Sequence, residues 1–236
     1  MLSRLLCEIA AHPLLSSELV FRGGTCLHKV HLPKALRYSE DLDYVRATHG
    51  PIGPLFDALR EIASTVGMEA ATDVAQFPKF FFRSSFESGS GRMQIKVEIN
   101  TYETSPARPH IRLRHEVKSR WWSGTAEVLT FEPAELVATK LRALYQRRKG
   151  RDLFDLWLAL TQMGLVPNDI LACLGPYRPD GFTTATATAN LLAHLAHPGF
   201  RRDLFDLVGE ETEFDVDEAA TLVIDKLLDR LGELGS

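Results

Sequence analysis

The sequence predicts an α+β protein in which a small mixed sheet with flanking helices is followed by a helical C-terminal region. Up to about residue 126, short apolar runs alternate with glycine and proline turns, a pattern typical of strands and short helices. From about residue 127, apolar residues recur at helical spacing instead. We therefore expect two domains, an α/β domain at residues 1–126 and an α-helical domain at residues 127–236.

The elements of the first region have local signals. Residues 2–11 carry leucine and isoleucine at helical spacing, and Pro13 ends that helix. The apolar run 19–21 leads into Gly23 and Gly24, which predicts a strand, a tight turn and a helix. We further expect strands at 41–45, 80–86 and 93–100, a turn at 89–91, a helix at 54–66, and a loop with one short strand at 101–120.

The second region is expected to be helical throughout. Pro133 suits the first turn of a helix that continues to Tyr145, and Gly150 precedes a second helix at 151–163. Further helical periodicity covers 188–196 and 218–234.

Composition excludes several classes of protein. With 45% apolar and 25% charged residues the chain is globular, and no run approaches the roughly 20 apolar residues of a membrane span. The formal charge of −4 argues against general polyanion binding, so any nucleic-acid contact must be local. Three widely separated cysteines support neither a disulfide framework nor a thiolate metal site. We expect a cytoplasmic protein with no membrane partner.

Asp41 and Asp43 are the main candidates for chemistry. Two carboxylates at i and i+2 on a strand point to the same face, where their repulsion favours a bound cation. Hard divalent ions such as Mg²⁺ or Mn²⁺ take oxygen ligands of this kind together with substrate phosphates. The pair therefore predicts a metal site, although the same pattern also occurs on ordinary solvated strand faces.

Two nearby features extend this hypothesis. The turn at Gly23 and Gly24 exposes backbone N–H groups at a helix start, which suits a triphosphate, and the alternative is a simple turn. Glu98 is predicted to share a strand face with Lys96 and Asn100. It is either a third carboxylate of the metal site or a surface acid that pairs with Lys96.

A second group of charged residues lies in the helical region. Lys140 accompanies an apolar helix stripe, so it either reaches a triphosphate as a point charge or extends to solvent. Asp152 and Asp155 fall near a predicted helix start, where the helix dipole alone favours acids. The basic clusters at 108–120 and 147–151 either follow an RNA backbone or form ordinary solvated faces.

The order of these motifs resembles the AbiEii/AbiGii nucleotidyltransferase toxin family, which includes the MenT toxins. The resemblance covers roughly residues 20–160. It rests on five blocks, namely FRGGTCLHK at 21–29, RYSEDLD at 37–43, KVEIN at 96–100, ELVATKLRAL at 135–144 and RDLFDL at 151–156.

The resemblance implies a polymerase-β-like core followed by a helical C-terminal domain that contributes Lys140 and Asp152 to the site. It implies that Asp41 and Asp43 bind the metal, that Lys140 contacts the nucleotide phosphates and that Asp152 is a further essential acid. Glu98 is the remaining candidate catalytic acid. The candidate nucleotide-binding residues are Gly23, Gly24, Thr25, Ser39 and Lys140. Two departures from the superfamily pattern are Thr25 in place of serine and the fifteen residues between Thr25 and Asp41.

The resemblance also implies the toxin of a toxin–antitoxin pair, which uses an NTP and a divalent metal ion to add nucleotides to the 3′ end of tRNA. A rival acceptor for the same chemistry is a protein or a small molecule. A rival class is a catalytically silent module that binds a nucleotide or a partner. The joint presence of Asp41, Asp43 and Lys140 argues against that class.

Overall fold

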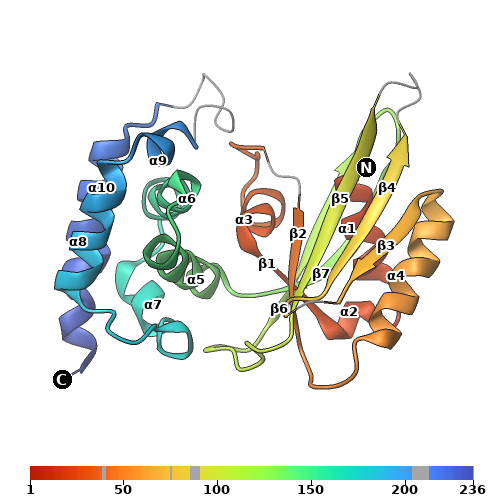
Figure 1. The fold of residues 1–236 in the computed structure, drawn as a ribbon, viewed down its shortest axis with the longest axis horizontal. Helices are drawn as coiled ribbons and strands as arrows, with labels where there is room; N and C mark the ends of the chain where they lie inside the picture. Colours follow the sequence, from red (N-terminus) through yellow and green to blue (C-terminus); the bar gives the residue numbers. More distant parts are fainter. Residues whose placement is uncertain (39–40, 75, 86–90, 204–212, 236) are drawn as a thin grey trace. The chain divides into compact units, whose positions relative to one another are not determined.

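The computed structural model describes residues 1–236 except 39–40, 75, 86–90, 204–212 and 236. The chain forms two compact units, one of residues 1–33 and 39–131 and one of residues 34–38 and 132–236. The first unit contains the sheet, and the second is helical (Figure 1). The chain enters the second unit at residue 34, returns to the first at residue 39 and enters the second again at residue 132.

A mixed sheet forms the centre of the first unit. Its described strands are β1 (Leu19–Arg22), β2 (Asp41–Arg46), β3 (Glu69–Asp73), β4 (Lys79–Ser85), β5 (Arg92–Asn100), β6 (Ile111–Lys118) and β7 (Ser123–Thr130), in the order β3-β4-β5-β2-β1-β7-β6. β2 is parallel to β5 and β1 is parallel to β7, whereas the other neighbouring strands are antiparallel. The strand that carries Asp41 and Asp43 is therefore held on both sides.

Helices cover one face of this sheet. α1 (Leu2–Ala11) contacts β7, α4 (Gly53–Val66) contacts β3 and β4, and the two helices contact each other. Neighbouring strands direct Leu42, Phe80 and Val97 toward the core, where all three are fully buried. Because side chains alternate along a strand, Asp41 and Asp43 project from the opposite face. The other described helical segments of this unit are α2 (Leu15–Glu18), α3 (Gly23–Cys26) and the π-helical η1 (Leu27–His31).

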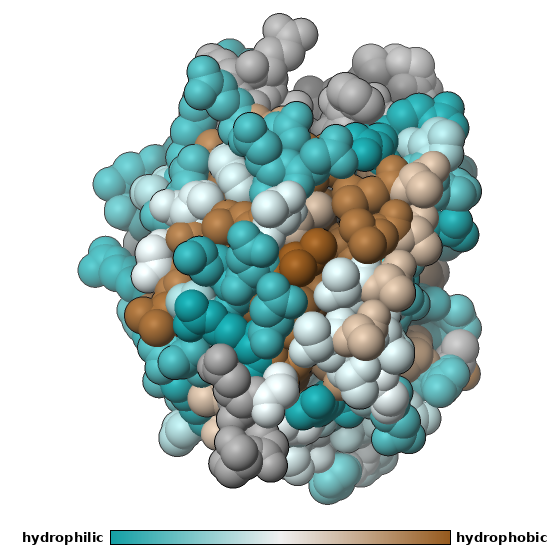
Figure 2. All heavy atoms as spheres, turned by 90° about the vertical axis from the view of Figure 1, so that its left-hand side faces the viewer, coloured by the Kyte–Doolittle hydropathy of each residue, from teal (hydrophilic) through white to brown (hydrophobic). Residues whose placement is uncertain are grey.

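The second unit is helical in its described residues from 133 onward, whereas residues 34–38 contain no helix. Its segments are α5 (Pro133–Gln146), α6 (Gly150–Thr161), α7 (Pro167–Ala172), η2 (Gly175–Tyr177), α8 (Thr184–Leu195), α9 (Pro198–Arg202), α10 (Val216–Val223), η3 (Ile224–Leu228) and η4 (Asp229–Gly235). α5 and α10 both pack against α6. The face in Figure 2 mixes hydrophobic and hydrophilic side chains, and Leu192 on α8 is among the exposed hydrophobic residues of this unit. In the described part of the chain, no helix has the length and apolar character to span a membrane.

The structure confirms the predicted α+β class but corrects several elements. The segment 101–120, expected as a loop with one short strand, contains the eight-residue hairpin strand β6, which pairs with β7 along its whole length. β3 was not predicted. Both β3 and β6 lie at the ends of the sheet, where one face stays polar and the apolar signal is weak. The predicted helix at 188–196 begins earlier, at Thr184, because Thr183 caps it through a capping box with Thr186.

Candidate functional site

Two adjacent strands in unit 1 bring the predicted acids together. β2 and β5 run in parallel, with Asp41 beside Lys96 and Asp43 beside Glu98. Cross-strand neighbours in register share a face of the sheet, so all four side chains lie on the face opposite α1 and α4. The predicted i and i+2 geometry of Asp41 and Asp43 is thus present, and Glu98 lies next to it.

Lys96 joins two of these acids. Its Nζ atom lies 3.1 Å from Asp41 Oδ2 and 3.3 Å from Glu98 Oε2. Partial burial lowers the pKa of Lys96, but the Asp41 and Glu98 carboxylates outweigh this effect and raise it above its ordinary value. The ammonium therefore stays charged and bridges the two strands. Glu98 pairs with Lys96, as one of the two alternatives predicted, and it also lies beside Asp43.

Asp43 has a raised pKa on this face. Burial raises its pKa first, and the negative charges of Glu98 and Asp41 raise it further, against the opposing effect of Lys96 and Arg22. Like charges this close disfavour simultaneous ionisation unless a cation balances them. The face therefore favours positive charge near Asp43.

Gly23 has a structural reason to be glycine. Its φ is +78°, and a Cβ atom there would lie 2.6 Å from Asp43 Oδ2. The glycine turn therefore touches the acidic face directly, which connects two motifs that lie 20 residues apart in sequence. Gly24 and Thr25 follow in α3 and are both buried.

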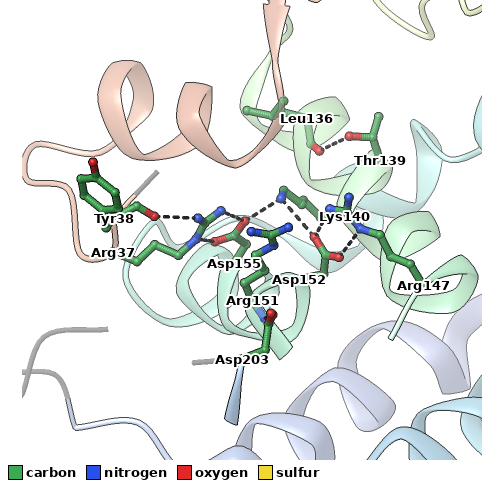
Figure 3. A network of polar contacts seen from close by, with 10 residues as sticks. All are labelled: Arg37, Tyr38, Leu136, Thr139, Lys140, Arg147, Arg151, Asp152, Asp155 and Asp203. Atoms are coloured by element: carbon green, nitrogen blue, oxygen red, sulfur yellow. Dashed lines mark hydrogen bonds and ion pairs between the residues drawn. The ribbon is translucent and has the colours of Figure 1, made fainter. Parts of the chain in front are cut away.

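A second charged cluster lies within unit 2 and is shown in Figure 3. Lys140 is 4% exposed, so it does not extend to solvent, which was the ordinary alternative for this residue. Its Nζ atom lies 3.1 Å from Asp152 Oδ1 and 2.7 Å from Asp155 Oδ2. Asp152 and Asp155 are one turn apart on α6 and fully buried. Helix position alone therefore does not account for them.

Two arginines complete this cluster. Arg37 donates to both carboxylate oxygens of Asp155 at 2.8 and 2.9 Å, and Arg147 donates to both oxygens of Asp152 at 2.7 and 2.8 Å. Burial raises the pKa of Asp152, but Lys140 and Arg147 together bring it below its ordinary value. Such bidentate arginine–carboxylate pairs orient the carboxylates and also neutralise their charge. The cluster holds three cations against two buried acids.

Sequence reasoning missed Arg37 as a member of this cluster. Arg37 lies 118 residues from its partner Asp155, and nothing in the local pattern indicates so distant an ion pair. The only available signal was its place four residues before Asp41 in the second motif block. Ser39, a predicted nucleotide-binding residue of that block, lies outside the described residues.

The described residues do not form a complete metal site. No group of three or more His, Cys, Asp or Glu side chains among the described residues is arranged to hold a metal ion. On the acidic face of unit 1, the ammonium of Lys96 contacts two of the three carboxylates. The donor atoms are nevertheless carboxylate oxygens, which hard divalent ions prefer.

The α+β core thus carries carboxylates on two adjacent parallel strands. The family model for the nucleotidyl transferase AbiEii toxin of type IV toxin–antitoxin systems matches residues 4–230. The chain belongs to this family. The resemblance drawn from the motif blocks is therefore confirmed, and the match extends well beyond both ends of those blocks.

The fold agrees with that of JHP933 from Helicobacter pylori, which is 18% identical, with a TM-score of 0.57, covering 99% of this chain and 91% of that one. The nucleotidyltransferase toxin MenT4 from Mycobacterium tuberculosis is also 18% identical, with a TM-score of 0.47, covering 94% of this chain and 90% of that one. No curated protein gives a significant match.

Proposed function

We propose that this protein transfers a nucleoside monophosphate from an NTP to the 3′ end of a tRNA, as the toxin of a toxin–antitoxin pair. The observation that best supports the chemistry is the set of three carboxylates, Asp41, Asp43 and Glu98, on one face of β2 and β5. Membership of the AbiEii family supports nucleotidyl transfer and an antitoxin partner. Addition to tRNA would block aminoacylation and hence translation.

The carboxylate face has the donor chemistry of a Mg²⁺ or Mn²⁺ site. Asp41 and Asp43 would hold the ion, and the raised pKa of Asp43 supports a need for positive charge there. When bound, the ion would neutralise charge on the phosphates of the NTP. Glu98 would serve as a further ligand or accept the proton of the attacking hydroxyl.

The chain's own residues would position the nucleotide. Its phosphates are proposed to bind the backbone N–H groups of Gly23 and Gly24 and the hydroxyl groups of Thr25 and Ser39. A substrate hydroxyl then attacks the α-phosphorus in line, a new P–O bond forms, and pyrophosphate leaves. Most of the rate enhancement in such a reaction comes from positioning and charge neutralisation.

Lys140 and Asp152 of unit 2 are proposed to take part in the same reaction. Lys140 would contact the phosphates, and Asp152 would hold its ammonium in place, as their 3.1 Å ion pair allows. Because Lys140 also pairs with Asp155 at 2.7 Å, a phosphate must compete with two carboxylates for this cation. Asp155 is therefore proposed as a positioning residue, through its bonds to Lys140 and Arg37.

Labelled nucleotides test this proposal directly. The protein is incubated with each of the four α-labelled NTPs and Mg²⁺, first with total RNA and then with protein alone. We expect label on tRNA 3′ ends, lost in Asp41→Asn and Asp43→Asn but kept in Asp73→Asn, an exposed acid on β3 of the same unit. Full transfer by Asp41→Asn would overturn the site assignment, and label confined to protein would overturn the RNA acceptor.

Two further experiments separate the rival readings. NTP binding that persists without metal and without Asp41, Asp43 and Lys140 would favour a catalytically silent binding module. For the toxin role, we expect expression of this chain to inhibit growth and a small adjacent reading frame to restore it. Absence of any growth effect would argue against that role.

A further inference from the structure

The hairpin between β6 and β7 ends in an ordered turn. Ser119 Oγ donates to Trp122 O at 2.8 Å and accepts from the backbone N–H groups of Trp121 and Trp122 at 3.3 and 3.1 Å. Ser119 N also donates to Trp122 O at 3.2 Å. One serine side chain thus fixes the backbone that carries both tryptophans.

The two tryptophans are placed very differently by this turn. The Trp122 ring folds back over Gly124, where a Cβ atom would lie only 2.4 Å from it. Trp121 instead points outward and is 79% exposed. The Arg120 guanidinium lies 4.4 Å from the centroid of the Trp121 ring. A cation held over an exposed aromatic ring gives a flat, positively charged surface at the tip.

Charged residues continue from the tip along the edge of the sheet. β6 is the last strand in the order, and its exposed positions are Arg112, Arg114, Glu116 and Lys118. Lys118 pairs with Glu116 at 2.9 Å, and Glu127 of β7 lies opposite Arg114. With Arg120, four cations face two carboxylates in a chain whose formal charge is −4. The edge is therefore a local basic feature of an acidic protein.

We propose that Trp121 and Arg120 form a stacking platform for an unpaired base of an RNA, while cations on β6 follow its phosphates. Base stacking on an exposed aromatic ring is a recurring way to bind single-stranded nucleic acid, and arginine adds to it. An RNA accounts for the aromatic ring and the basic edge together. This inference rests on the proposed function, since it names the surface that receives the RNA acceptor.

Fluorescence anisotropy with the full chain and a fluorescein-labelled single-stranded RNA dodecamer tests the platform. We expect Trp121→Ala to raise Kd about 5- to 150-fold, since one stacked base contributes roughly 1–3 kcal/mol. Trp121→Phe should restore most of the affinity. Tyr102→Ala removes another exposed aromatic ring of the same unit, 64% exposed, and should leave Kd unchanged.

Salt dependence tests the basic edge separately. The double variant Arg114→Gln with Arg120→Gln should lower the slope of log Kd against log salt by about one to two, since each lost phosphate contact removes about one released counterion. The control is Arg60→Gln, which also removes an exposed arginine charge, but from α4. It should not alter the slope.

The outcomes separate this inference from the proposed function. Transfer to RNA with unchanged Kd in Trp121→Ala would overturn the platform and leave the proposed function standing. Trp121-dependent RNA binding without any transfer would support the platform and remove RNA as the acceptor. Binding to anionic lipid vesicles that depends on Trp121, with no effect of Trp121→Ala on RNA, would overturn the platform in favour of a membrane contact.

Discussion

The ammonium of Lys96 lies 3.1 Å from Asp41 Oδ2, on the face where we propose a divalent metal ion. It also lies 3.3 Å from Glu98 Oε2, so one side chain of β5 balances acids on both strands. Lys96 therefore supplies the positive charge that the acidic face needs when no metal ion is bound. A metal ion at Asp41 must then coexist or compete with this ammonium.

Substitution of Lys96 by methionine should strengthen metal binding and weaken the metal-free fold. Removing a positive charge a few ångströms from a cation favours that cation, so we expect the Kd for Mn²⁺ to fall about tenfold or more. The melting temperature without metal should fall, and Mn²⁺ should restore it. Isothermal titration and thermal unfolding measure the two effects. Lys118→Met on the exposed hairpin is the control, and an unchanged Kd in Lys96→Met would contradict competition.

Gly23→Ala should disable the acidic face, whereas Gly67→Ala should not. Both glycines have positive φ, +78° and +71°, so alanine costs each roughly 1–2 kcal/mol of unfolding free energy. Only at Gly23 does the new Cβ collide with Asp43 Oδ2. We therefore expect Gly23→Ala alone to lose metal affinity and nucleotide transfer by about tenfold or more. Equal losses in both variants would show that backbone strain, and not the contact with Asp43, is responsible.

Asp155→Asn should destabilise unit 2 strongly. The carboxylate accepts from Arg37 and pairs with Lys140, and it is fully buried. Asparagine keeps the shape but leaves two cations undercompensated, which costs roughly 3–5 kcal/mol in buried pairs. Urea unfolding followed by circular dichroism measures this loss. Asp225→Asn, at an exposed position on η3, should change the free energy of unfolding by less than about 0.5 kcal/mol.

His31 should make the protein less stable as the pH falls from 6.5 toward 4. Burial lowers the pKa of the folded His31 from 6.5 to about 4, and its Nε2 atom has no hydrogen-bond partner. The unfolded chain therefore takes up the proton first, so this contribution is complete above pH 6.5 and is lost as pH drops toward 4.

The matching variant is His31→Phe. Between pH 7.5 and 4.5 we expect wild type to lose about 2 kcal/mol more unfolding free energy than the variant, a figure reduced for the partial exposure of the ring. Urea titrations at each pH measure the difference. His49→Gln, at an exposed position, should follow the wild-type curve. Parallel curves for wild type and His31→Phe would mean that His31 is not the titrating group.

Local patterns were sufficient for most interior elements of both units, but β7, which lies between β1 and β6 in the sheet, was not predicted. Helical spacing predicted α1, α4, α5 and α6, and alternation predicted the central strands β2 and β5. The edge strand β3 was not predicted, and β6 was expected only as one short strand within a loop, because polar residues dilute the apolar signal of edge strands.

The sequence by itself determined the family, the α+β class and the facing of Asp41 and Asp43, because motif order and a two-residue strand period are properties of the chain alone. Only the tertiary structure decided which partners these residues have. The Lys96–Asp41 pair depends on the register between β2 and β5. The Arg37–Asp155 pair depends on the chain entering unit 2 for residues 34–38. Such pairs are fixed by packing between distant segments, and no local spacing encodes them.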